Sequence, residues 1–330
     1  MKKIINKPEN YVNETLSGIL RAYPDKLRAV SDDLKAIVRK DAPINGKVAI
    51  ATGGGSGHLP IFLGYVGRGL ADGVAVGNIF SSPSPEHILA VTNSIDGSVG
   101  VLYLYGNYQG DILNFDRAAE MAELEEISVE TVLVSDDVAS AESRKWNSRR
   151  GIAGLFFAYK IAGACADEMN DLIKVASVTR KAVENIRSMG VALSPCIIPE
   201  SGHPTFELSE NEIEIGIGIH GEKGVKRSKM ISADEITEIL VNEIINDLPF
   251  KKGDEVAVLI NGFGATPREE LFIMYRRTWE LLNDMGIKIF RNYIGEYATS
   301  LDMAGASITL FKLDDIFKRY LTAPANSPFL

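Results

Sequence analysis

The stretch Lys47–His58 has the sequence KVAIATGGGSGH, and its pattern predicts the fold class of the chain. A short apolar run, Lys47–Thr52, is followed at once by glycines, which is typical of a buried strand that ends in a loop. More strand-like runs follow, at residues 73–76, 99–105 and 131–134, with helical patterns between them at 86–93 and 114–126. This alternation predicts an α/β layer structure with a largely parallel sheet.

The rest of the chain predicts a second structure of the same class. We expect a helical segment over residues 11–39, broken near Pro24, and helices over 152–168 and 170–189. Strand patterns then lie at 212–220, 254–260, 287–293 and 306–313, and helical patterns at 233–247 and 267–285. Because 330 residues exceed the usual size of one domain, we place an N-terminal domain at 1–190 and a C-terminal domain at 191–330. Each is expected to be a β-sheet flanked by helices.

The composition argues against several classes of function. A formal net charge of −9 is unfavourable for nucleic-acid binding, because phosphates require a basic surface. Cys165 and Cys196 lack the spacing of a metal site. The most apolar stretch, 151–166, contains Lys160 and is too short to span a bilayer, and the first residues lack the apolar stretch of a signal peptide. We therefore expect a cytoplasmic protein that binds no metal, nucleic acid or membrane.

The predicted strand 212–220 contains the first candidate functional residue. By the two-residue alternation of a strand, its isoleucines share one face, while Gly216, Gly218 and His220 share the other. Two glycines would leave an open strip beside His220, and glycine in a strand often marks the close approach of a ligand. The alternative is a histidine exposed to water at the end of the strand. The spacing alone leaves both interpretations open.

The glycine loop Gly53–His58 is the second candidate. A loop at the carboxyl end of an α/β strand is where ligands bind in such sheets. The loop has neither the Lys-Ser/Thr of a phosphate-binding P-loop nor the GxGxxG spacing, so it predicts no nucleotide site. It is compatible with a nest for a small ligand. His58 is either a functional residue or a histidine at a helix start without a role.

A third candidate is Asp111, which ends the turn Gly106–Asp111 after the predicted strand 99–105. It is either a reactive carboxylate or the cap of the following helix, a role that Asp often has. His87 and His203 are interpreted as structural. A neutral imidazole can add to a carbonyl carbon, and a second imidazole and a carboxylate can exchange protons with the product. His220, His58 and Asp111 would therefore suit a small hydroxylated ketone.

At these residues the sequence resembles the substrate-binding K subunit of dihydroxyacetone kinases. The matching segments run in order over nearly the whole chain: GGGSGH (53–58), GNIFSSPSP (77–85), GNYQGDILNF (106–115), RRGIAG (149–154), GVALSPC (190–196), IGIGIHGEKGVKR (215–227), LINGFGATP (259–267) and TSLDMAGASITLFKLDD (299–315). So many ordered matches are far more specific than any single glycine loop.

The resemblance implies two α/β domains per subunit and a homodimer. It implies a covalent hemiaminal between the substrate and the imidazole of His220. His58 would transfer protons, and Asp111 would activate the substrate hydroxyl. The substrate would also lie against the loop residues Gly55, Ser56 and Gly57.

The resemblance also implies the partners. No cofactor is expected on this chain, because ADP or ATP with Mg²⁺ binds a separate L-type subunit in this family. That subunit would be recharged by an M-type subunit of a phosphotransferase system or loaded with ATP.

Two departures from the family pattern leave alternatives open. Many members have Glu where this chain has Leu59, and Lys where it has Gly106. One alternative is a kinase subunit for erythrulose, a four-carbon ketose, instead of dihydroxyacetone. Another is a ketose-binding transcriptional co-regulator without kinase activity.

Overall fold

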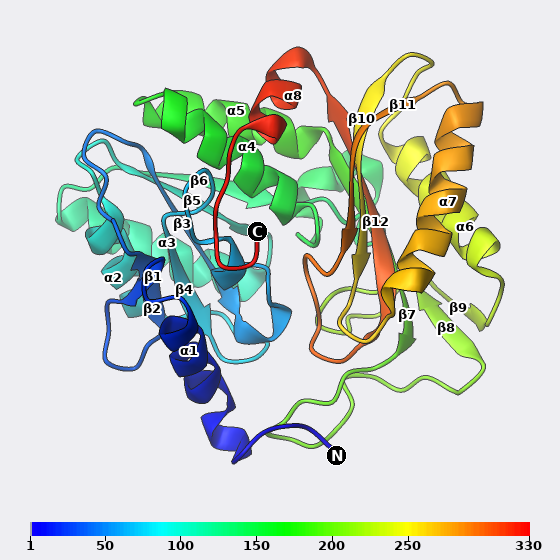
Figure 1. Ribbon diagram of the computed structural model, residues 1–330, viewed down its shortest axis with the longest axis horizontal. Helices are drawn as coiled ribbons and strands as arrows, with labels where there is room; N and C mark the ends of the chain where they lie inside the picture. Colours follow the sequence, from blue (N-terminus) through cyan, green and yellow to red (C-terminus); the bar gives the residue numbers. More distant parts are fainter. Residues whose placement is uncertain (1) are drawn as a thin grey trace. The chain divides into compact units, whose positions relative to one another are not determined.

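The structure is a computed structural model that describes residues 2–330, and these form two compact units (Figure 1). Unit 1 contains the chain up to Val134, Leu155–Ala182 and Arg319–Leu330, and unit 2 contains Ser135–Gly154 and Val183–Lys318. Each unit has one six-stranded sheet with helices packed on it, so the prediction of two α/β structures is confirmed. The division differs from a single boundary at residue 190, because the chain passes between the units more than once.

In unit 1 the strand order is β1-β2-β4-β3-β5-β6. The strands are β1 (Leu27–Ala29), β2 (Ala36–Arg39), β3 (Ala49–Gly55), β4 (Gly73–Gly77), β5 (Val101–Gly106) and β6 (Val129–Val134). From β4 to β6 all neighbours are parallel, while β1 and β2 join as an antiparallel hairpin at the edge. The four strands of the predicted parallel sheet are therefore present.

The helices of this region are α1 (Tyr11–Ala22), α2 (Pro85–Ile95), α3 (Gln109–Leu124), α4 (Leu155–Glu168), α5 (Leu172–Glu184) and α8 (Asp315–Thr322). Alternate residues of β3 face opposite layers, as expected for a strand buried on both sides. Ala49 and Ala51 pack in a core with α2 and α3. Thr52, on the other face, makes a 2.7 Å hydrogen bond with the hydroxyl of Tyr159 in α4. Across residues 2–330, no helix has both the length and the apolar composition that crossing a membrane requires.

Two predicted helices are too long. The helix predicted over 11–39 ends at Ala22, and the residues after Pro24 form the hairpin of β1 and β2. All four residues of β2 are buried, so pairing with β4 overrides the local helical pattern. The helix predicted over 170–189 ends at Glu184, because the following residues pair within the sheet of unit 2.

In unit 2 the strand order is β11-β10-β12-β7-β8-β9, with only β10 and β11 parallel. The strands are β7 (Ile186–Ser194), β8 (Glu212–Ile215), β9 (Lys226–Lys229), β10 (Glu255–Gly262), β11 (Lys288–Gly295) and β12 (Ala304–Leu313). Helices α6 (Ala233–Asp247) and α7 (Arg268–Asp284) lie side by side on one face of this sheet (Figure 1) and share its apolar core. Their predicted positions are confirmed to within a residue.

The segment Ser135–Gly154 belongs to unit 2 through buried polar contacts. The main-chain N–H of Val138 donates to Ser188 of β7 at 3.0 Å. Arg149, fully buried, makes two hydrogen bonds to the carboxylate of Asp247 at the end of α6. Such contacts join residues far apart in the sequence, which is why a division into consecutive halves does not describe the molecule.

Two helical glycines provide a test of the packing in unit 1. A Cβ on Gly163 of α4 would lie 2.2 Å from the carbonyl oxygen of Gly69, whereas a Cβ on Gly18 of α1 would meet no atom within 4 Å. We expect Gly163→Ala to destabilise the protein by roughly 1–3 kcal/mol through overpacking. Gly18→Ala should be neutral or stabilise by up to about 1 kcal/mol, since Ala favours helix. Urea unfolding of both variants measures the difference; equal stabilities would contradict this packing.

Candidate active site

The glycine loop after β3 allows two main-chain segments to approach closely. Gly53–Gly55 complete β3, and Ser56–His58 form a short 3₁₀ turn. The N–H of Gly57 donates to the carbonyl oxygen of Ile79 at 2.8 Å. A Cβ on Gly55 would lie 2.3 Å from that oxygen, and one on Gly57 would lie 2.8 Å from it. The loop therefore requires glycine at both positions, because the main chain at Ile79 occupies the space that a Cβ would need.

Sheet topology brings three motif segments to one edge of unit 1. The chain continues from β3 to β4 on one side and later to β5 on the other, so the order reverses at β3. In α/β sheets ligands bind at the carboxyl edge beside such a reversal. Asn114 of α3 donates to the carbonyl oxygen of Pro83 at 2.8 Å. This hydrogen bond joins the segments 77–85 and 106–115, and the loop 53–58 is joined to the first of them through Ile79.

The strands β3 and β5 separate at this edge. β5 pairs with β3 only as far as Ala51, whereas Gly53–Gly55 pair with β4 alone. The turn that contains His58 and the first turn of α3, which contains Asp111, thus follow two neighbouring strands that no longer bond to each other. Unit 1 therefore places these two predicted site residues at the same edge of one sheet.

His58 is fully buried among aromatic side chains. Its ring centroid lies 4.9 Å from that of Phe80 and 6.2 Å from that of Phe62. An imidazole in such a position is shielded from water and held by packing. This is an unusual place for a histidine that merely begins a helix at the surface.

Asp111 lies in the first turn of α3, and the N-cap position of this helix is Tyr108. The Asp111 carboxyl group is buried, with 6% exposure, near the positive end of the helix dipole, where a negative charge is favourable. Burial, together with the charges of Asp116 and Asp111, raises the pKa of Tyr105. Asp111 therefore does not occupy the cap position, and its charge acts on a buried hydroxyl.

Two buried hydroxyl groups lie near this edge of the sheet: Ser56 follows β3, and Tyr105 belongs to β5. Within residues 2–330, neither the hydroxyl of Ser56 nor that of Tyr105 has a hydrogen-bond partner. A buried polar group without a partner costs about 1–3 kcal/mol. A polar ligand would satisfy the hydroxyl of Ser56, which belongs to the loop that contains His58, whereas the ring of Tyr105 stacks on Phe115 in the core of unit 1.

His220, the third predicted site residue, lies in unit 2 but not in a strand. β8 ends at Ile215, and Gly216 has φ +80°, a left-handed conformation that ends the strand. The strand predicted over 212–220 is therefore wrong beyond Ile215. The burial predicted for the isoleucines is confirmed, because all four, at 213, 215, 217 and 219, are at most 2% exposed.

The open strip predicted beside His220 is occupied by charged side chains. A Cβ on Gly218 would lie 2.1 Å from Oε2 of Glu222 and 2.6 Å from Nη1 of Arg150. Oε1 of Glu222 lies 2.9 Å from Nδ1 of His220. The space left by the missing Cβ of Gly218 is therefore filled by the carboxylate of Glu222 and is not open to a ligand. The sequence analysis missed Glu222 and Arg150, although the spacing His-x-Glu in a glycine-rich turn was visible.

The electrostatics of this turn favour an ionised Glu222. Burial alone would raise the pKa of Glu222, but the hydrogen bond with His220 and the charges of His220 and Arg150 lower it to about 2. Arg150 is held in turn by Asp137, whose Oδ2 accepts from Nε at 2.9 Å. The imidazole of His220 therefore faces a carboxylate throughout the neutral pH range.

The remaining sequence candidates have local roles. His87 lies between Ser84 and Asp33, with its Nε2 atom 2.6 Å from the carboxylate of Asp33. Leu59 lines a cavity of about 10 Å³ together with Gly55 and Ser56, and Gly106 ends β5. Leu59, the departure from the family pattern, thus lies next to the loop predicted to contact substrate.

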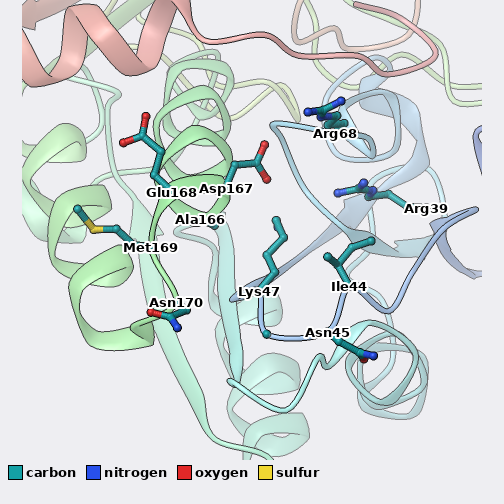
Figure 2. A pocket seen from close by; sticks show the side chains of 11 residues that line it. Arg39, Ile44, Asn45, Lys47, Arg68, Ala166, Asp167, Glu168, Met169 and Asn170 are labelled. Carbon is teal, nitrogen blue, oxygen red and sulfur yellow. The ribbon is translucent and has the colours of Figure 1, made fainter.

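A larger cavity, of about 540 Å³, lies at the amino end of β3 (Figure 2). Arg39 and Lys47 line it, but both are already paired with the buried carboxylate of Asp72, at 2.8 and 2.6 Å. Within residues 2–330, no three His, Cys, Asp or Glu side chains are grouped to hold a metal ion. The cavity contains none of the predicted reactive residues, and we assign no site to it.

Comparison with known proteins gives the family. The model of the Dak1 domain matches residues 17–329. A dihydroxyacetone-binding subunit DhaK of a PTS-dependent dihydroxyacetone kinase from Listeria innocua is 44% identical, over 100% of this chain and 99% of the relative. An L-erythrulose kinase from Pectobacterium atrosepticum is 40% identical over 99% of this chain, which spans only 56% of that protein.

Solved structures give the same result. A dihydroxyacetone kinase operon co-activator, DhaQ, superimposes with a TM-score of 0.89 at 31% identity, covering 96% of this chain and 97% of that one. The dihydroxyacetone kinase of C. freundii gives a TM-score of 0.88 at 30% identity, covering 99% of this chain and 59% of the longer kinase. The resemblance inferred from the ordered motifs is confirmed, and the chain belongs to the Dak1 family, among the relatives of the DhaK subunits.

Proposed function

We propose that this chain is the ketose-binding subunit of a dihydroxyacetone-type kinase. The observation that carries the proposal is that His58 and Asp111 are both buried in segments that follow two neighbouring strands, the turn after β3 and the first turn of α3 after β5. The buried hydroxyl of Ser56 belongs to the same loop as His58, and a hydroxylated ligand would satisfy it. These groups suit a small polyhydroxylated ketone, whereas a nucleotide triphosphate would require Lys or Arg and a metal.

In this proposal the ketose is held covalently on His220. Nε2 forms a bond to the carbonyl carbon, the π electrons of the carbonyl pass to its oxygen, and that oxygen takes a proton as the imidazole loses one. His58 exchanges protons with the new hydroxyl. Asp111 takes the proton from the terminal hydroxyl as that oxygen attacks the transferred phosphoryl group. The loop Gly55–Gly57 would contact the substrate.

The phosphoryl group would come from a partner. We propose that an L-type subunit carries ADP or ATP with Mg²⁺, and that an M-type subunit of a phosphotransferase system or ATP itself recharges it. The name of the Listeria innocua relative, a PTS-dependent kinase subunit, supports the first source. We further propose that the chain forms a homodimer and acts in the cytoplasm.

Two alternatives have specific support. The match to an L-erythrulose kinase, together with Leu59 beside the substrate loop, favours a four-carbon ketose as the substrate. The likeness to the co-activator favours a ketose sensor without transfer activity. Assaying the chain with an L-type subunit against dihydroxyacetone and both erythrulose enantiomers separates the three functions. Adduct formation without transfer to any of them would favour the sensor.

His220→Ala should abolish the covalent adduct, because no other group in the proposal adds to the carbonyl. With dihydroxyacetone labelled with ¹³C at C2, wild type should shift the NMR signal of C2 from the carbonyl region to that of a tetrahedral carbon, and the variant should not. His203→Ala, at an exposed histidine, is the control and should behave as wild type. An adduct of undiminished intensity in His220→Ala would refute the covalent role.

Asp111→Asn should leave adduct formation largely intact and slow phosphoryl transfer by roughly 10²–10⁴, the range that general-base catalysis supplies. Asn has nearly the size of Asp but cannot take the proton. Asp116→Asn, an exposed carboxyl group on the same helix, should transfer at the wild-type rate. Equal rates for both variants, measured with the same L-type subunit, would show that Asp111 is not the base.

The isolated chain should not bind Mg-ATP appreciably, since the proposal places the nucleotide on the partner. Isothermal titration calorimetry of the purified chain tests this directly. Micromolar binding would contradict the proposed division of labour between subunits.

A further inference from the structure

The turn that contains His220 is built around a single carboxylate. Both oxygens of Glu222 face His220: Oε1 lies 2.9 Å from the ring nitrogen Nδ1, and Oε2 accepts the main-chain N–H of the same residue at 3.0 Å. One side chain thus holds both the ring and the backbone of His220. The His220 side chain is 23% exposed, so the ring is held while part of it stays accessible.

Glu222 is itself held from behind by Arg150. Nη1 of Arg150 lies 3.8 Å from Oε2 of Glu222, and Nη2 donates to the carbonyl oxygen of Gly216 at 3.3 Å. The guanidinium is anchored by the fully buried carboxylate of Asp137, at 2.7 Å. Burial raises the pKa of Asp137 to about 7 despite the charge of Arg150. A chain of hydrogen bonds and ion pairs therefore runs from Asp137 through Arg150 and Glu222 to His220, entirely within unit 2.

Gly218 makes this arrangement possible. Its N–H donates to the main-chain carbonyl of Glu222 at 3.1 Å, which closes the turn. Any larger residue would place a Cβ 2.1 Å from Oε2 of Glu222 and displace the carboxylate. Gly218 is thus required because a side chain at this position would collide with the carboxylate of Glu222.

A carboxylate can only accept a hydrogen bond, so the ring nitrogen facing it must carry the proton. The neutral imidazole of His220 is then protonated at Nδ1, and its lone pair lies on Nε2. In serine proteases a buried carboxylate sets the tautomer of a histidine by the same logic. Addition of Nε2 to a carbonyl carbon also makes the ring transiently positive, and a neighbouring carboxylate offsets that charge.

We propose that Glu222 is a positioning residue for His220: it holds the ring in the Nδ1–H tautomer, orients Nε2 for addition to the ketose, and offsets the positive charge that forms. The orientation of Nε2 toward the ketose and the offset of the positive charge rest on the proposed function. The tautomer of His220 does not, because it is a property of the ligand-free protein. The low pKa of Glu222, about 2, agrees with a group that stays ionised beside the ring.

The test compares Glu222→Gln with Glu210→Gln, which changes an exposed carboxyl group in the same unit. Nitrogen-15 NMR of the ligand-free proteins should show His220 as the Nδ1–H tautomer in wild type and in the control. In Glu222→Gln the amide can also donate, so the Nε2–H form should appear. The rate of adduct formation with ¹³C-labelled dihydroxyacetone should fall by up to about 10⁴-fold, by analogy with the wrong-tautomer effect in the protease triad.

Two further variants keep the test decisive. Glu222→Asp retains the charge and should recover part of the rate. Gly218→Ala keeps the carboxylate but displaces it, so the tautomer should change as in Glu222→Gln; this variant replaces Glu222→Gln if that protein does not fold.

The proposal is overturned if the substituted protein keeps the Nδ1–H tautomer and forms the adduct at the rate of the Glu210→Gln control. If wild type itself forms no adduct with any ketose, the proposed function fails. The NMR comparison still decides the tautomer in that case, so the two failures are distinguishable.

Discussion

The pairing of β3 with β4 on one side and β5 on the other is the constraint on which the site in unit 1 depends. Parallel strands end at the same edge, so this pairing fixes where the glycine loop and the start of α3 lie. Because β5 separates from β3 after Ala51, the loop and the helix end are not tied to each other by ladder hydrogen bonds. His58 and Asp111 can therefore both be buried at the edge without being part of the sheet.

Glycine serves a different purpose in each unit. In the loop of unit 1 it lets one main chain approach another, as the contact between Gly57 and Ile79 demonstrates. In the turn of unit 2, Gly218 gives space to the side chain of Glu222. A missing Cβ beside a candidate catalytic residue is easily interpreted as room for a ligand. Here the occupant is a carboxylate of the protein itself, and the chemical consequence is control of the histidine.

Volume alone would have pointed to other places, such as a cavity of about 790 Å³ lined by Glu120 of α3 and Glu130 of β6. The cavity of about 540 Å³ at the amino end of β3 is far larger than the one of about 10 Å³ beside the glycine loop. Two of its cations, Arg39 and Lys47, are already paired with Asp72, and none of the predicted reactive residues lines it. Buried reactive groups, and hydroxyls such as that of Ser56, which has no hydrogen-bond partner among residues 2–330, are the better guide to chemistry in this molecule.

The sequence by itself determined the α/β class, most strands and helices, and the candidates His58, Asp111 and His220, because hydrophobic periodicity and glycine loops are local signals. Only the tertiary structure decided the rest. Residues 36–39 form a strand because β4 offers them a buried partner, and residues 27–29 pair with that strand in turn. The chain crosses between units because buried contacts such as Arg149 with Asp247 join distant segments. Glu222 faces His220 because Gly216 takes a left-handed conformation that ends the strand, and a two-residue alternation cannot reveal such a turn.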